Sequence, residues 1–489
     1  MKFKLTLAAA LLLPMLAAGQ TAHAEAPYKS YVYNEWDQSK ASPTGYLPGG
    51  SYTGIEAGAG AFMEPQDLFV DAQDNVYVAD TGNKRIVKLN EEFKAETVID
   101  GLSWQGSELK LSAPTGLFVS GDGTMYIADK EAGRVIRAGA DGKADLVIEK
   151  PQDPLIASDF VFKPVKVAAD NAGRIYVLSE GQFFGLMQFD AKGKFTGYYG
   201  SNRVEVTPAV VLESFWKSIL SKEQRDAMMK LLPIEYSNLH IGADNFVYTT
   251  TIVSRNSREE IKKLNPLGNN VLVTSGGAAD FGDKEISFKG GVKQDSSFLD
   301  VAVDGDGFIA GLDRTRGKVF EYDAEGNPVS IFGSLGHQRG TFGQPVALAY
   351  WKDELLVLDA GKRNVTRFVR SEYGSLVREA TILYNQGLYE EAAVIWKEVA
   401  RRNTSNEIAY LGMAKALEKE GDYEEALHYY KLGTSRSGYS DTFGLKRMDT
   451  VRGNLPLIMT VLIAALAGYY GYKGFRLWRN AKRKEVAGG

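Results

Sequence analysis

A repeating unit of just under fifty residues fills the middle of the chain and constrains its fold more than any other feature. In each copy, runs of β-branched and aromatic residues alternate with Gly, Asp and Asn turns, which is the pattern of antiparallel hairpins. One such sheet cannot bury both of its faces alone, whereas six sheets stacked around an axis bury a continuous core and protect their edges. The sequence therefore predicts a mainly β, six-bladed propeller, with copies that start near residues 65, 114, 164, 235, 298 and 345.

Two segments outside the regular copies are expected to complete this propeller domain, which we place over residues 25–372. The segment Tyr28 to Trp36 is aromatic and strand-like, so we expect it to supply the outer strand of the last blade and close the ring. Between the third and fourth copies, Thr207-Pro208 offers a helix start and apolar residues follow at helical spacing. We expect a helical insertion over 207–233 that packs on the propeller, caps one mouth or docks a partner.

The turn between the last two copies resembles a known family. Its sequence runs from Phe332 to Pro345 and is similar to the inter-blade turn of NHL-repeat propellers, and the first copy has the related spacing Gly60-x-Phe62-x-x-Pro65. The resemblance covers about residues 55–372 and is strongest in the first and sixth copies. It implies an NHL-type propeller that acts as a binding platform or, as in some relatives, as a lactonase-like hydrolase or a peptidylglycine lyase.

After Tyr373 the periodicity changes from that of strands to that of helices. The run from Gly387 to Ala392 recurs at Gly421 to Ala426, thirty-four residues later. A helix–turn–helix unit of this length is typical of tetratricopeptide (TPR) repeats. Residues 373–452 thus resemble a small all-α pair of TPR repeats with a capping helix, and the resemblance implies that a concave groove binds a peptide or protein.

Both ends of the chain carry apolar runs. Residues 1–24 combine a basic start, a short apolar stretch and a small-x-small site, which predicts a signal peptide cleaved after Ala24; a retained anchor is the alternative. Residues 453–472 carry no charge and as a helix span about 30 Å, the thickness of the hydrocarbon layer; a buried hydrophobic helix is the alternative. The tail 473–489 is basic, so the positive-inside rule predicts that it lies in the cytoplasm. We expect a single-pass protein of the cell membrane with an extracytoplasmic body.

Composition excludes several kinds of site. The chain has no cysteine and only four histidines, so disulfides, thiol nucleophiles and cysteine zinc sites are ruled out and a histidine zinc site is poorly supplied. The formal charge of −4 gives no basic footprint for nucleic acid. The sequence has neither a Gly-x-Ser-x-Gly elbow nor a Walker loop. We therefore predict no catalytic residue, no cofactor-binding residue and no required cofactor.

Four aspartates recur at the ends of predicted core strands: Asp80, Asp129, Asp313 and Asp359. If they converged at one mouth of the propeller they could hold calcium, as in lactonase-like relatives. The alternative is that each accepts backbone N–H bonds in its own turn, which is a common role of Asp. The four residues are weak calcium candidates, and we favour the second interpretation.

The order of the parts predicts a membrane-anchored binding or scaffold protein. The propeller mouth would recognise a ligand or partner, and the TPR pair would dock a second protein close to the membrane. This layout is similar to bacterial surface NHL/TPR proteins that accompany transport systems. The alternatives are a calcium-dependent hydrolase or lyase on the propeller, and a propeller that binds polysaccharide through its Tyr and Trp side chains. A small-molecule or carbohydrate ligand is compatible with each.

Overall fold

The computed structural model describes residues 26–34, 36–200, 235–251, 260–274, 277–278, 281–284, 288–289, 292–293 and 295–486. The expected signal peptide over 1–24 and the expected helical insertion over 207–233 lie outside these residues.

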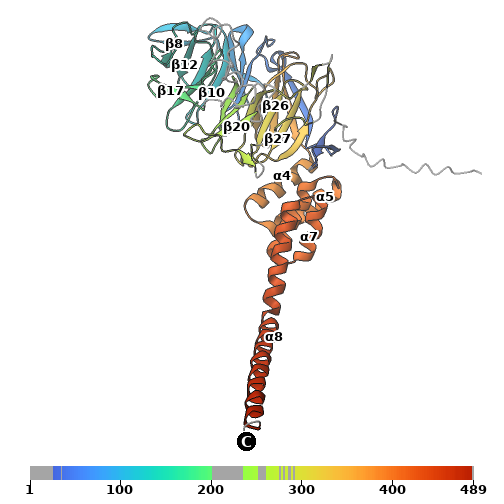
Figure 1. Ribbon diagram of the computed structural model, residues 1–489. Helices are drawn as coiled ribbons and strands as arrows, with labels where there is room; N and C mark the ends of the chain where they lie inside the picture. Colours follow the sequence, from blue (N-terminus) through green and yellow to red (C-terminus); the bar gives the residue numbers. More distant parts are fainter. Residues whose placement is uncertain are drawn as a thin grey trace, which may run out of the picture.

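The described part of the chain forms six antiparallel sheets arranged as the blades of a propeller (Figure 1). The first three blades are β4–β7, β10–β13 and β14–β17. Their strands are β4 (Asp67–Val70), β5 (Val76–Asp80), β6 (Arg85–Leu89), β7 (Ala95–Ile99), β10 (Pro114–Val119), β11 (Met125–Asp129), β12 (Arg134–Ala138), β13 (Ala144–Ile148), β14 (Pro164–Ala169), β15 (Ile175–Ser179), β16 (Leu186–Phe189) and β17 (Phe195–Tyr199).

The remaining three blades complete the circle, and the predicted six-bladed architecture is confirmed. Three strands of blade 4 are described, and blades 5 and 6 have four strands each. Their strands are β18 (Tyr236–Ile241), β19 (Val247–Thr251), β20 (Ile261–Leu264), β25 (Phe298–Val303), β26 (Ile309–Asp313), β27 (Lys318–Tyr322), β28 (Pro328–Phe332), β29 (Pro345–Trp351), β30 (Glu354–Asp359), β31 (Asn364–Arg370) and β3 (Tyr46–Thr53).

The strand that closes the ring is β3, not the segment predicted for this role. β3 pairs with β31 from Tyr46↔Arg370 to Thr53↔Asn364. Within the predicted segment 28–36, the strand β1 (Tyr31–Tyr33) pairs instead with β2 (Ser39–Ala41) in a separate hairpin. The prediction was wrong because β3 contains Pro48-Gly49-Gly50, which reads as a turn, although the register shift between Pro48 and Ser51 absorbs it.

The core lies between the faces of neighbouring blades. Every residue of the second strands β5, β11, β15, β19 and β26 is buried, because each of these strands is covered on both faces. One cluster joins Leu68 and Val78 of blade 1 to Leu356 and Val365 of blade 6, so apolar packing also crosses the seam where the ring closes.

Short elements decorate the propeller. The hairpin β8–β9 extends from blade 1 toward blade 2, and two smaller hairpins lie between blades 4 and 5. Their bounds, with those of two short helices, are α1 (Gly54–Ala57), η1 (Thr81–Asn83), β8 (Gly101–Trp104), β9 (Ser107–Lys110), β21 (Val273–Thr274), β22 (Gly277–Ala278), β23 (Phe288–Lys289) and β24 (Val292–Lys293).

A helical region follows β31 without a linker. It consists of α4 (Glu372–Asn385), α5 (Tyr389–Arg402), α6 (Glu407–Glu420), α7 (Tyr423–Leu432) and α8 (Arg436–Val486). Successive helices pack on one another. Trp396 of α5 lies so close to Gly412 of α6 that a Cβ at position 412 would be 2.2 Å from its ring, so only glycine fits there.

The last helix extends away from the rest of the molecule (Figure 1). α8 has 51 residues, which corresponds to about 77 Å at 1.5 Å per residue. It is long and apolar enough to cross a membrane. Each residue from 451 to 483 is exposed, so the apolar part of α8 has no protein partner within the described chain.

Candidate binding channel

The first strand of each blade contributes one residue to a layer near one end of the central channel. In β10, β14, β18, β25 and β29 the pairing with the second strand shifts register directly after the first residue of the strand, and the residue after the shift takes the equivalent position in each blade. Asp67 occupies this position in β4. We call these residues the polar layer: Asp67, Gly116, Lys166, Asn238, Asp300 and Ala347.

The four polar side chains of this layer link blades that are not all neighbours. Lys166 of blade 3 forms an ion pair with Asp67 of blade 1, and Asn238 of blade 4 donates a hydrogen bond to Asp300 of blade 5. Gly116 of blade 2 allows the backbone of β14 to approach closely, because a Cβ there would lie 2.4 Å from the carbonyl oxygen of Val165. The layer therefore combines two carboxylates, one ammonium group and one amide in a small buried space.

Both carboxylates also hold the backbone of the next blade. Asp67 Oδ2 accepts a 2.8 Å hydrogen bond from the N–H of Leu117, and Asp300 Oδ2 accepts one of 2.7 Å from the N–H of Leu348. Asp67 and Asp300 are only 5% and 4% exposed. The layer is thus built into the ring rather than placed on mobile surface side chains.

Burial sets the electrostatics of the polar layer. Desolvation raises the pKa of Asp300 to about 7; Lys166 opposes this increase and the Asp67 carboxylate adds to it. Burial acts to lower the pKa of Lys166, but the attraction of Asp67 and Asp300 outweighs burial and raises that pKa. The two carboxylates therefore share one compensating lysine, and the lysine stays charged.

A second layer, two residues further along the same strands, leaves space in the channel. It consists of Phe69, Phe118, Ala168, His240, Ala302 and Ala349. The rings of Phe69 and Phe118 meet edge to face with centroids 5.3 Å apart, whereas the three alanines fill little volume. Burial lowers the pKa of His240 to about 4, so its imidazole is neutral at pH 7.

The space that these two layers line is a cavity of about 480 Å³. It extends from the polar layer to the turns that join the first and second strands of blades 1 to 4, which include Gly121, Asn171 and Asn245. Tyr350 of blade 6 lines it as well. We call this end of the propeller the helix-side end, because the equivalent turn of blade 5 contacts α4.

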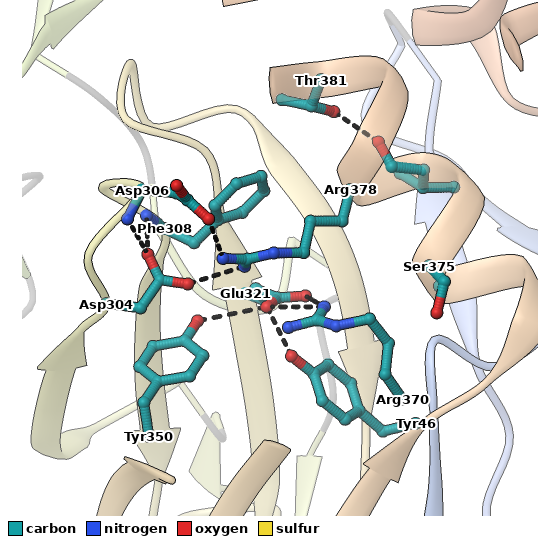
Figure 2. Close-up of polar contacts among 12 residues, drawn as sticks. Tyr46, Asp304, Asp306, Phe308, Glu321, Tyr350, Arg370, Ser375, Arg378 and Thr381 are labelled. Atoms are coloured by element: carbon teal, nitrogen blue, oxygen red, sulfur yellow. Dashed lines mark hydrogen bonds and ion pairs between the residues drawn. The ribbon is translucent and has the colours of Figure 1, made fainter. Parts of the chain in front are cut away.

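The contact between the propeller and α4 is a charged junction (Figure 2). Arg378 of α4 reaches between Asp304 and Asp306, at 2.6 and 2.5 Å, and lies over the ring of Phe308. Beside it, the buried Glu321 pairs with Arg370 at 3.2 Å. The two ion pairs and the ring contact of Arg378 therefore connect α4 to blade 5.

Tyrosines and the N-terminal segment extend this junction. Glu321 Oε1 accepts hydrogen bonds from the hydroxyls of Tyr46, at 2.6 Å, and Tyr350, at 3.1 Å (Figure 2). Tyr350 thereby belongs to both the junction and the channel wall. On α8, Arg436 lies over the ring of Trp36, 5.4 Å from its centre. The helical region thus contacts the propeller through Arg378 and the N-terminal segment through Arg436.

The four aspartates singled out in the sequence lie at the ends of β5, β11, β26 and β30, and the structure does not bring them together. Each is fully buried and accepts backbone hydrogen bonds from the segment that precedes the first strand of its own blade. Asp129, for example, accepts bonds from Ser112 and Ala113 and pairs with Arg134 at 2.9 Å. Their contacts agree with the interpretation as turn acceptors. Among the described residues, no group of three or more His, Asp or Glu side chains is arranged to hold a metal.

The polar layer was missed in the sequence although a signal was present. When the six repeats are aligned on Pro65, Pro114, Pro164, Tyr236, Phe298 and Pro345, the column two residues later holds Asp, Gly, Lys, Asn, Asp and Ala. An apolar residue follows this column in each copy. Charged residues at one position of otherwise similar buried strands indicate a polar site on the axis of the propeller. A comparison of what the repeats share does not reveal this column, because the column consists of differences between them.

Comparisons with known proteins agree with the fold. Residues 62–89, in blade 1, match the NHL repeat family, which confirms the NHL resemblance for that blade. A search of curated protein sequences found no match to this chain.

Several solved structures are similar to part of this chain at low sequence identity. A catalytically inactive virginiamycin B lyase from Staphylococcus aureus, solved with quinupristin, is 12% identical over 63% of this chain and 80% of that chain, with a TM-score of 0.37. A protein of unknown function from Bacteroides thetaiotaomicron is 12% identical over 70% and 76%, with a TM-score of 0.38. The RRP9 WD40 repeats are 10% identical over 67% and 97%, with a TM-score of 0.39. Likenesses of this degree do not extend to activity.

Proposed function

We propose that the chain is a membrane-anchored, extracytoplasmic binding and scaffold protein. In this proposal residues 1–24 are a signal peptide, 25–372 the propeller domain, 373–452 a TPR-like segment with its capping helix, 453–472 the transmembrane helix and 473–489 a cytoplasmic tail. The propeller recognises a ligand or partner, and the TPR-like segment docks a second protein next to the membrane.

The observation that carries the proposal is the continuity from the propeller to the exposed apolar helix. Arg378 joins α4 to the propeller through Asp304 and Asp306, and helix packing continues without a break into α8. The apolar residues of α8 have no cover in the described chain, and in water they would be unfavourable by about 25 cal/mol per Å² of exposed surface. A lipid bilayer supplies that cover, and it places the propeller on a short, stiff support.

The helices α4 to α7 support the docking role. They form two helical hairpins in which Gly387 and Gly421, both with positive φ, stand at the equivalent helix ends. Val394 of α5 is 72% exposed, and Tyr410 of α6 is partly exposed and stacks on Tyr429. Apolar side chains exposed on a helical array are typical of protein-binding surfaces.

The absence of cysteine allows a clean test of topology, because the unaltered chain gives no background with thiol reagents. Asp141→Cys places one thiol in an exposed turn of blade 2, and Lys482→Cys places one beyond the apolar part of α8. In intact cells, a membrane-impermeant maleimide should label D141C, and K482C should react only after lysis. Equal labelling of both in intact cells, or the reverse pattern, would contradict the proposed orientation.

Site-specific photocrosslinking tests the docking role in the full-length protein. A photoreactive amino acid at Val394 or at Tyr410 should give an adduct of discrete mass with another protein in intact membranes. The matched control is Ile55, which is 69% exposed and follows the end of β3 that is opposite to the pairing of Tyr46 with Arg370. Absence of an adduct at both helical positions, or the same adducts at Ile55, would overturn the docking proposal.

A further inference from the structure

The channel contains a buried carboxylate whose direct partners are all neutral. Within the described residues Asp300 accepts hydrogen bonds from the Asn238 amide and from the backbone N–H groups of Val301 and Leu348. The nearby ammonium group, Lys166, forms its ion pair with Asp67 instead. Two buried carboxylates thus share the single positive charge of Lys166. Because buried carboxylates with too little counter-charge are unfavourable by several kcal/mol, this site favours a further cation.

The walls above Asp300 suit an apolar body that carries such a cation. Phe69 and Phe118 line one side of the cavity, and aromatic faces attract cations as well as apolar groups. Ala168, Ala302 and Ala349 leave the other side open. The cavity of about 480 Å³ lies in the range of small-molecule sites, roughly 300–1,000 Å³.

The same groups disfavour other ligand classes. An anion would meet two carboxylates against a single ammonium group, and the neutral His240 adds no positive charge. A calcium ion needs about six to eight oxygen ligands, whereas the oxygens of Asp67 and Asp300 are already engaged by lysine, amide and backbone donors. The polar layer can therefore accept one further positively charged hydrogen-bond donor.

We propose that the channel binds a small organic ammonium ion with an apolar body, whose charged group pairs with Asp300 and whose body lies between Phe69, Phe118 and the alanines of the second layer. The ligand enters from the helix-side end, where the cavity reaches the turns of blades 1 to 4. This site does not depend on membrane anchoring or on docking by the helices, so it stands or falls separately from the function proposed above.

Calorimetric titration of the full chain in detergent micelles tests the proposal with phenethylamine and its neutral isostere 2-phenylethanol. Phenethylamine is expected to bind saturably with one site per chain, and the alcohol at least about tenfold more weakly, because it lacks the charge. Detergent partitioning would affect the two compounds alike. Equal titration curves, or no saturable binding of the amine, would overturn the proposal.

Substitutions in the polar layer should act with opposite signs. Asp300→Asn should weaken binding of phenethylamine by about tenfold or more, whereas Lys166→Gln removes the competing charge and should strengthen it. Asp141→Asn, in an exposed turn outside the channel, is the matched control. A purely structural role for the layer would make both channel variants weaker binders, and that result would contradict the proposal. If Asp300→Asn does not fold, Lys166→Gln and the comparison of phenethylamine with 2-phenylethanol still test whether the channel binds an ammonium ion.

Discussion

Two sets of carboxylates lie side by side in the propeller and behave differently. Asp80 ends the second strand of blade 1, and the residue before it pairs with Asp67 of the first strand; the same arrangement relates Asp313 to Asp300 in blade 5. The strand-end aspartates Asp80, Asp129, Asp313 and Asp359 recur among the blades and bind backbone N–H groups. The polar layer changes from blade to blade and faces a cavity.

The difference separates what builds a blade from what distinguishes one blade from another. A role needed in each blade, such as fixing the turn before the first strand, produces a residue that repeats. A site on the axis is asymmetric, because each blade contributes once to it, so its residues depart from the repeat. In a propeller the recurring polar residues therefore indicate scaffold, and the exceptions on the first strands indicate the binding site.

The strongest test of this contrast is Asp129→Ala. The substitution leaves the N–H groups of Ser112 and Ala113 without an acceptor and Arg134 without its buried partner. The free energy of unfolding should fall by about 4 kcal/mol, while binding to the channel of the folded protein stays unchanged. Denaturant unfolding of the full chain in detergent measures the loss. If the free energy of unfolding falls no more, within measurement error, than it does in the control Asp141→Asn, the scaffold role is contradicted.

The second test is a double-mutant cycle across the channel, with Asp67→Asn and Lys166→Met. Each single change leaves a buried partner unsatisfied, whereas the double change removes the ion pair as a whole. The loss in the double variant should be smaller than the sum of the single losses by about 2 kcal/mol. Additive losses would show that Lys166 and Asp67 do not interact across the axis.

The third test uses pH, because the pKa of Asp300 is raised to about 7 by burial, from about 3.9 in an unfolded chain. The folded state then binds this proton more tightly, so its contribution to stability is greatest below pH 4 and is lost as pH rises toward 7. The slope is at most about 1.4 kcal/mol per pH unit for one proton. Unfolding free energies at pH 5 to 8 should therefore decline more steeply in the wild type than in Asp300→Asn.

The comparison with Asp300→Asn also removes the effects of the neighbouring groups. His240 has a lowered pKa of about 4, so it acts in the opposite direction and increases stability as pH rises from 4 to 6.5. Asp67, Lys166 and His240 are present in both proteins, and the difference between the two profiles isolates Asp300. Parallel profiles would contradict the raised pKa.

The smallest expected effect concerns the other set of carboxylates. Arg134 binds Asp129 through Nε and Nη2 and also donates to the carbonyl oxygen of Lys110. Arg134→Lys keeps the charge but loses the fork, so the free energy of unfolding should fall by about 1 kcal/mol. Thermal unfolding measures this small loss. A loss as large as that of Asp129→Ala would show that Asp129 stabilises the blade mainly through its ion pair with Arg134 and not through the backbone N–H bonds that it accepts.

The repeats made the architecture predictable, because turn residues and strand periodicity are local properties of the chain. Pro114, Pro164 and Pro345 do start first strands, and the predicted helical region begins within a residue of α4. The closing strand was misplaced because its pairing with β31 is a long-range property, and Pro48-Gly49-Gly50 hides a strand that only its partner defines. Lys166 and Asp67 come from different blades, so their meeting across the axis follows from ring closure and not from any local pattern.

The seam between β3 and β31 also sets the order in which the molecule can mature. β3 can pair only after β31 has been synthesised, because Tyr46 pairs with Arg370. The first five blades are therefore synthesised before the ring can close. Contacts between such distant residues are slow to form. The junction of Tyr46, Glu321 and Arg370 lies at this seam, and α4 starts two residues beyond it. We therefore expect closure of the ring and attachment of the helices to be coupled and to occur late in folding.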